Sequence, residues 1–198
     1  MKGQQAISVI LLTGILIVTV SSIYFWGIPL IEKNKDIALQ ENTENFMRNL
    51  AERVKYVANN PGREQIRLDI DGVLRYDGDS IELDVETRGT IYEAGGFIPL
   101  GKNDCSATSG TWGVNNPETL CVKSQLIGER SYLTTYRLSF VQLDTSGADA
   151  FKIQLIGNPK QSGGSRTIIL QNKGTTEAVE LPGPKNVVKS LVEFDVQS

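Results

Sequence analysis

The sequence predicts an α+β protein in which a long N-terminal α-helix precedes an antiparallel β-sandwich-like head domain. Three observations lead to this fold class. The 198-residue chain has no charged residue from Gly3 to Ile31, and it has neither Gly nor Pro from Glu32 to Asn60. After Gly62, apolar and polar residues alternate in short segments separated by glycine-containing turns. These patterns divide the chain into a helix over residues 4–60 and a β-rich domain over residues 61–198.

The first half of the expected helix is apolar on every side. Residues 6–31 read AISVILLTGILIVTVSSIYFWGIPLI, which is longer than the roughly 20 apolar residues that a helix needs to cross a bilayer. Tyr24 and Trp26 lie near its outer end, where aromatic rings favour the membrane interface. Pro29 removes a backbone hydrogen bond and predicts a kink. We expect a membrane helix with its N-terminus inside, the orientation that Lys2 favours.

A cleaved secretory signal peptide is the alternative for this segment, because Val20-Ser21-Ser22 suits a signal peptidase. Cleavage there would leave the apolar sequence IYFWGIPLI at the start of a secreted domain. Such an exposed end promotes aggregation unless a partner covers it, which disfavours this alternative.

The second half of the helix is amphipathic. Phe46, Leu50, Val54 and Val57 recur at spacings of four, four and three residues and form one apolar stripe. Pro61 and Gly62 then end the helix. A helix over residues 4–59 is on the order of 80 Å long, and its apolar stripe predicts that the outer half docks on the domain that follows.

The domain after Gly62 consists of short segments in which every second residue is apolar. Asp-Gly and Gly-rich turns separate these segments, and no helical pattern lies between them. Seven or so such strands predict an antiparallel sandwich or small barrel. The predicted strands cover residues 66–70, 73–76, 81–86, 131–143, 151–156, 167–171 and 187–196.

Cys105 and Cys121 flank a stretch rich in Ser, Thr, Gly and Asn that has no periodicity. Two cysteines beyond an exported segment favour a disulfide over a metal site, which needs more ligands and usually His. A disulfide that closes a loop of this length gains about 3 kcal/mol. Free thiols in a cytosolic chain are the alternative. Trp112 in this loop either binds a partner or packs the loop down, and we favour packing.

Charge and composition exclude several function classes. The formal net charge is −3 and the chain has no His, so neither a nucleic-acid footprint nor a His-based enzyme or zinc site is expected. Glu82, Asp84 and Glu86 share one face of a strand and form either a carboxylate pair site or a solvated row. The aspartates around residues 69–84 fit turn chemistry better than a calcium loop. We expect no catalytic residue, no metal and no cofactor.

The N-terminus resembles the class III signal of archaeal type IV pilins and archaellins. Lys2 and Gly3 precede Gln4, and a long uncharged helix follows. In that family a prepilin peptidase cuts after such a glycine and the helix stays on the mature protein. The resemblance implies a leader over residues 1–3 and a mature chain that starts at Gln4. The leader is shorter than usual, and Ser8 replaces the Glu typical of bacterial pilins, which favours the archaeal branch.

The resemblance implies a structural subunit that polymerises as a homopolymer through its N-terminal helix. Its implied partners are the prepilin peptidase and the pilus assembly machinery, and its implied location is the cytoplasmic membrane before assembly and the cell surface afterwards. The expected contacts in the filament core come from the helix residues Ile7, Leu11, Ile15, Val18 and Ile23. A charge at Ile15 is expected to abolish filaments while residues 61–198 still fold.

Two other hypotheses belong to different classes. One is a single-span anchored ectodomain that never polymerises and binds a surface partner such as the surface layer. The other is an anchored enzyme that uses the acidic segment, which the missing His and the absence of a nucleophile motif disfavour.

Overall fold

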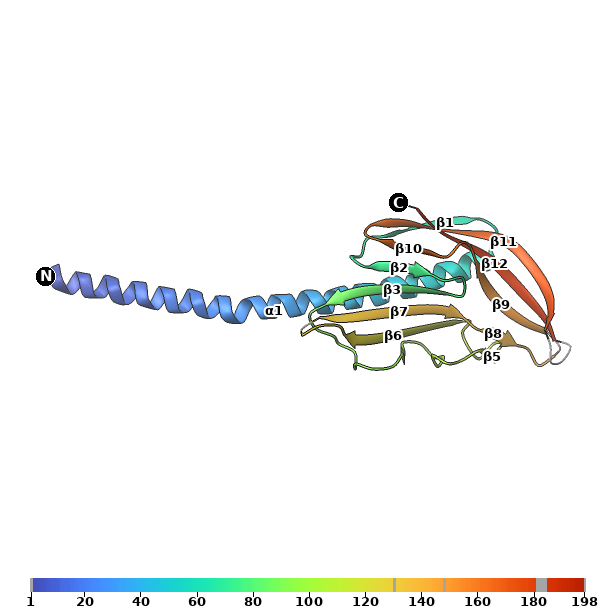
Figure 1. Cartoon of the computed structure of the whole chain (residues 1–198), viewed down its shortest axis with the longest axis horizontal. Helices are drawn as coiled ribbons and strands as arrows, with labels where there is room; N and C mark the ends of the chain where they lie inside the picture. Colours follow the sequence, from blue (N-terminus) through green and yellow to red (C-terminus); the bar gives the residue numbers. More distant parts are fainter. Residues whose placement is uncertain (1, 130, 148, 181–184, 198) are drawn as a thin grey trace.

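The computed structural model describes residues 2–129, 131–147, 149–180 and 185–197. One helix, α1 (Lys2–Asn59), is followed by a domain of strands, which makes the chain an α+β protein as expected. Figure 1 shows the N-terminal half of α1 projecting from the head as a free rod, whereas its C-terminal half lies along the strands. We call residues 6–31 the stem, residues 32–59 the stalk and residues 61–198 the head.

α1 continues through Pro29 as one helix, so the proline does not end it. Its C-terminal end is fixed by a residue from far along the chain. The side-chain amide of Asn172 donates to the carbonyl oxygens of Val57 at 2.7 Å and Asn60 at 3.2 Å. These bonds satisfy carbonyl groups that the end of a helix leaves without partners. The helix therefore ends where the Pro61-Gly62 pair predicted.

The head contains two six-stranded sheets. The first has the order β1 (Arg63–Leu68), β11 (Arg166–Glu180), β12 (Lys185–Gln197), β9 (Asp149–Ile156), β8 (Gln142–Asp144) and β5 (Ser109–Thr111). The second has the order β10 (Lys160–Gly163), β2 (Val73–Tyr76), β3 (Ser80–Thr87), β7 (Tyr132–Phe140), β6 (Glu118–Leu126) and β4 (Ile98–Pro99). The arrangement is sandwich-like, as the alternating segments predicted.

The prediction of a purely antiparallel head is wrong for the first sheet. β12 pairs with β9 in parallel, and β5 pairs with β8 in parallel, while the other strand pairs are antiparallel. The chain leaves β9 for the second sheet, forms β10 there, and returns through β11. After this crossover β12 runs beside β9 in the same direction, which a direct hairpin connection could not produce.

The predicted strand over residues 131–143 is two strands in different sheets. β7 ends at Phe140 in the second sheet, and β8 begins at Gln142 in the first. Val141 between them donates its backbone N–H to the carbonyl of Pro117 at 2.8 Å. The chain crosses between the sheets at this residue, so a single period-two segment serves both layers.

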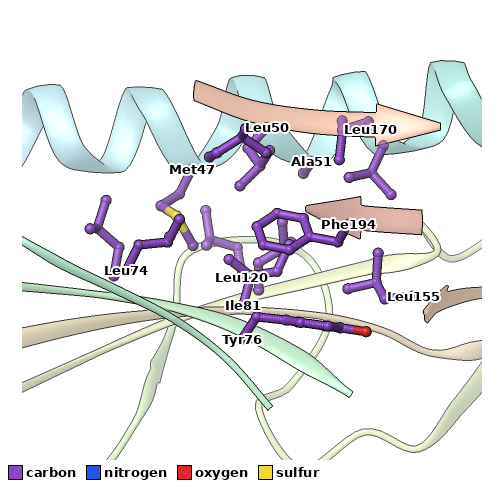
Figure 2. Packing of buried hydrophobic residues seen from close by; sticks show 14 of the residues in the cluster. Met47, Leu50, Ala51, Leu74, Tyr76, Ile81, Leu120, Leu155, Leu170 and Phe194 are labelled. Carbon is purple, nitrogen blue, oxygen red and sulfur yellow. The ribbon is translucent and has the colours of Figure 1, made fainter. Parts of the chain in front are cut away.

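The stalk forms part of the core of the head. Met47, Leu50 and Val54 are completely buried, and Figure 2 shows Met47, Leu50 and Ala51 above residues of both sheets. Their neighbours include Leu74, Ile81 and Tyr76 from the second sheet and Leu170 and Phe194 from the first. The predicted docking of the amphipathic half is confirmed. Because α1 completes the core, we no longer expect residues 61–198 to fold alone.

Candidate functional site

The stem is exposed on all its faces. The expected contact residues Leu11, Ile15, Val18 and Ile23 are each at least 58% exposed, and the consecutive residues Val9, Ile10, Leu11 and Leu12 are all exposed. Consecutive residues of a helix point in different directions around its axis. No side of the stem is therefore covered by the rest of this chain, in the part that the structure describes.

The apolar surface of the stem is too large to remain in water. Sixteen large apolar side chains between Val9 and Ile31 are exposed. Full burial of one such side chain contributes about 1.5–3 kcal/mol of free energy. A stem left in water therefore loses on the order of 20 kcal/mol or more of this stabilisation. A whole domain is typically stable by about 5–15 kcal/mol. An exposed apolar surface of this size is typical of a membrane or protein interaction site.

The polar residues of the stem do not oppose such burial. The hydroxyl groups of Thr13, Thr19 and Ser22 donate to the backbone carbonyls of Val9, Ile15 and Val18, each at 2.8 Å. These donors are satisfied within the helix, as they must be in an apolar environment. By length and composition, α1 can cross a membrane.

The residues of the expected cleavage position, Lys2, Gly3 and Gln4, form the first residues of α1. Their side chains and that of Ile7 lie outside the described part of the structure.

A set of polar contacts fixes the head to the helix where the stem ends. Asp36 accepts the backbone N–H groups of Arg88 and Gly89, each at 3.0 Å, through one carboxylate oxygen. Arg88 in turn forms an ion pair with Glu32 at 2.5 Å. These contacts attach the segment after β3 to the first turns of the stalk.

Gln40 is the centre of this attachment and has no exposed surface. Its side-chain amide donates to the hydroxyl of Thr87 at 3.1 Å and to the carbonyl of Gly89 at 2.6 Å. Its side-chain oxygen accepts the backbone N–H of Ile91 at 3.0 Å. One side chain of the helix thereby holds three residues of the head, and we call this region, Asp36 and Gln40 with residues 87–92, the joint.

Two tyrosines extend the joint into the core. The hydroxyl of Tyr136 lies 2.9 Å from the backbone carbonyl oxygen of Gln40 and 3.2 Å from the hydroxyl of Tyr92. Tyr92 donates to the carboxylate of Glu44 at 2.8 Å. Burial raises the pKa of Tyr92 to about 12, with the charge of Glu44 acting in the same direction. Burial also raises the pKa of Tyr136, so both rings are neutral at ordinary pH.

The joint therefore makes the head sensitive to alkaline pH. In the unfolded chain a tyrosine has a pKa of about 10, so above pH 10 the unfolded state loses protons that the folded state keeps. The free energy of unfolding must then fall as pH rises from about 10 toward 12. Urea unfolding of the full chain in detergent, followed by circular dichroism, measures this slope. Tyr92→Phe should make the slope shallower, and an unchanged slope would contradict the assignment to Tyr92.

Several acidic residues of the head have arginine or backbone partners. Arg75 pairs with Asp84 at 2.6 Å and with Glu82 at 3.3 Å, and Arg137 pairs with Glu82 at 2.7 Å. Asp77 accepts the backbone N–H groups of Asp79 and Ser80, which is turn chemistry as expected. Within the described residues there is no group of three or more metal-ligating side chains.

The predicted disulfide between Cys105 and Cys121 is present. Trp112 in the loop that it closes packs against Phe151, with 4.6 Å between ring centroids, so the expected packing is confirmed. Trp112 is nevertheless 54% exposed. It forms one wall of a groove with a volume of about 430 Å³ at the end of the stalk.

Sequence reasoning found the stem and the disulfide but missed the joint. Asp36 and Gln40 lie on an amphipathic helix, where polar residues ordinarily face water. The position of Gln40 offers a faint signal, because it is seven residues before Met47 and therefore lies on nearly the same side of the helix. The capping role of Asn172 has no signal in the sequence, because its partners are more than 110 residues away.

No protein-family model, curated protein or solved structure matches this chain.

Proposed function

We propose that this protein is a structural subunit of an archaeal type IV pilus-like surface filament, which polymerises through its stem and carries its head outside. The observation that supports this proposal most directly is the exposure of the stem on every face. A helix that is apolar all round fits a core in which each copy touches several neighbours. The N-terminal Lys2-Gly3-Gln4 pattern supports the same assignment through its resemblance to the class III signal.

The joint supports a filament role as well. In a filament held by its helices, the position of each head depends on how firmly it is attached to its helix. The contacts of Asp36 and Gln40 place this attachment within three turns of the last stem residue, Ile31. Heads attached in this way keep a fixed orientation relative to the core, which a regular helical assembly requires.

A single-span anchored ectodomain is the second candidate. The observation that favours it is that α1 is long and apolar enough to cross a membrane without any partner. Detergent extraction separates the two candidates. Monomer under all conditions favours the anchor, whereas sheared high-mass fibres whose N-terminus is Gln4 favour the filament subunit.

Ile15→Glu is expected to abolish filaments while the chain remains in the membrane. A carboxylate in the middle of a membrane helix costs about 3 kcal/mol on insertion scales, which the remaining apolar side chains of the stem offset. In a filament core the same carboxylate must lie against apolar neighbours in every copy, where an unpaired charge is not tolerated. Negative-stain electron microscopy of sheared cell-surface material, together with the amount of protein in the membrane fraction, measures the two effects.

Val179→Glu is the matched control, because Val179 is 69% exposed on the head and receives the same charge. This variant should form filaments like the parent chain. Intact filaments in Ile15→Glu would overturn the proposal. Loss of filaments in both variants would also count against a specific role of the stem.

A further inference from the structure

The groove beside Trp112 lies at the end of the head that is farthest from the stem. Asn59, the last residue of α1, contributes to its lining together with Trp112, Asn115, Phe151 and Ser190. Figure 1 shows β5 and β8 at this end, opposite the N-terminus. If the stem is embedded in a membrane or a filament core, this groove faces outward.

The exposed ring of Trp112 is held rigidly. The backbone N–H of Trp112 donates to the carbonyl of Asp144 at 2.9 Å, and Val114 and Asn115 donate to the carbonyl of Thr111 at 3.1 and 2.9 Å. Gly113 has a φ of +79°, which favours glycine and defines the tight turn after the ring. The disulfide and these bonds constrain the loop, and the contact with Phe151 constrains the ring before any ligand arrives, which lowers the entropy cost of binding.

The lining combines one large aromatic face with hydrogen-bonding groups. Asn59, Asn115 and Ser190 bring amides and a hydroxyl, Lys152 brings an ammonium group, and no carboxylate is among the described lining residues. The amide nitrogen of Asn59 also donates to the carbonyl of Lys55 at 2.8 Å, so a ligand would use its second N–H or its oxygen. The ammonium group of Lys55 lies 2.6 Å from Glu52 and 3.1 Å from Glu118. Burial lowers the pKa of Lys55, but the two carboxylates outweigh this effect and raise it, so the amine stays charged and paired. A ligand here needs hydroxyl groups and an apolar ring face.

A peptide strand is a poor fit for the same surface. The nearest edge strand is β5, which has only three residues. The backbone N–H of Thr111 in this strand already donates to the side-chain oxygen of Asn115 at 2.9 Å. The edge therefore lacks the row of free donors that strand addition uses.

We propose that this groove binds a hexose unit of a surface glycan, with the ring stacked on Trp112 and its hydroxyl groups bonded to the amides of the lining. A sugar ring presents C–H groups on its faces and hydroxyls around its edge. The electron-rich face of an indole attracts such C–H groups, and the volume of about 430 Å³ falls within the range of small-molecule sites. The outward orientation of the groove rests on the proposed function, whereas the binding itself does not.

Saturation-transfer NMR on the full chain tests this site, in a detergent without a sugar headgroup. The probes are the methyl glycosides of glucose, galactose, mannose and N-acetylglucosamine. We expect transfer to the ring protons of at least one probe, and Trp112→Ala should weaken its binding about tenfold. Ser190→Leu narrows the groove without removing Trp112 and should also weaken binding. This second variant tests the site even if Trp112→Ala disturbs the loop.

The controls separate the groove from the rest of the molecule. Val114→Ala changes an exposed residue of the same loop, and Trp26→Phe removes the other tryptophan, in the stem. Both should bind like the parent chain. Absence of transfer for all four probes, or equal binding by Ser190→Leu and the parent, would overturn the glycan site. Because this measurement needs no filament, its failure is distinguishable from a failure of the filament proposal.

Discussion

Residues 33–198 are expected to fold into a soluble domain, whereas residues 61–198 are expected to remain unfolded. The difference between the fragments is the stalk, which supplies Met47, Leu50, Ala51, Val54, Val57 and Ala58 to the core. Loss of a single large side chain of this kind costs about 2–5 kcal/mol. Loss of all six exceeds the stability of a typical domain, which is about 5–15 kcal/mol. Circular dichroism and amide NMR dispersion of the two fragments measure the effect.

A synthetic peptide of residues 33–60 provides the matched control for this experiment. Its addition to the unfolded fragment 61–198 should restore dispersed amide signals, because the missing part of the core is then supplied in trans. Leu50→Ala in the longer fragment should lower the free energy of unfolding by about 2–5 kcal/mol. A cooperative thermal transition of residues 61–198 alone would show that the stalk only covers a domain that is already complete.

Gln40→Ala is expected to destabilise the head by about 2–4 kcal/mol. The variant leaves the N–H of Ile91, the hydroxyl of Thr87 and the carbonyl of Gly89 without their partner on the helix. Each buried polar group that loses its partner costs about 1–3 kcal/mol, although Thr87 also donates to the carbonyl of Gly89 and keeps that bond. Denaturant unfolding of the full chain in detergent measures the loss.

Glu41→Ala is the matched control for Gln40→Ala, because Glu41 is the neighbouring residue and is exposed. It should unfold at the same denaturant concentration as the parent chain. Hydrogen exchange provides a second, local measurement, since the amide of Ile91 should exchange faster in Gln40→Ala. Unchanged stability and unchanged exchange would show that Gln40 does not hold the joint.

The sequence predicts the helix and much of the head because the relevant patterns are local. The stem is a long uncharged run, the stalk has one apolar stripe, and β2 was predicted with its observed bounds of residues 73–76. β11 extends well beyond its predicted range because its residues 175–180 pair with β12 alone, whereas residues 166–171 also pair with β1. This outer part of β11 is largely exposed and therefore carries only weak alternation.

Other strands have no local pattern that would reveal them. β6 turns Leu120, Val122 and Ser124 inward, and the completely buried hydroxyl of Ser124 lies 3.3 Å from that of Thr134. A serine paired in this way breaks the apolar alternation. β10 is an edge strand of polar residues and glycine, paired on one side with β2. Parallel pairing of β9 and β12 depends on the crossover between the sheets. The residues of the two strands show no sequence pattern that would reveal it.

The candidate sites likewise differ in whether a local sequence pattern reveals them. The exposed stem follows from composition, and the disulfide is inferred from two cysteines that follow a predicted membrane segment. The joint depends on Gln40 meeting residues about 50 positions away. The groove depends on Trp112 packing on Phe151 while keeping one face open. The joint and the groove can be recognised only in the three-dimensional structure. In the sequence, the residues that form them look like ordinary surface residues.

The course of the stalk between the sheets has a mechanical consequence. Figure 1 shows α1 running along the strands β3, β6 and β7, so tension applied at the stem acts nearly parallel to them. The bonds of Asp36, Gln40 and Glu44 to the head are then strained together in shear, whereas a head attached by a flexible linker would peel away one contact at a time. Pulling the stalk out of the head requires the simultaneous loss of the joint and of the apolar contacts from Met47 to Ala58. The head is thus expected to resist axial force on the helix through its core.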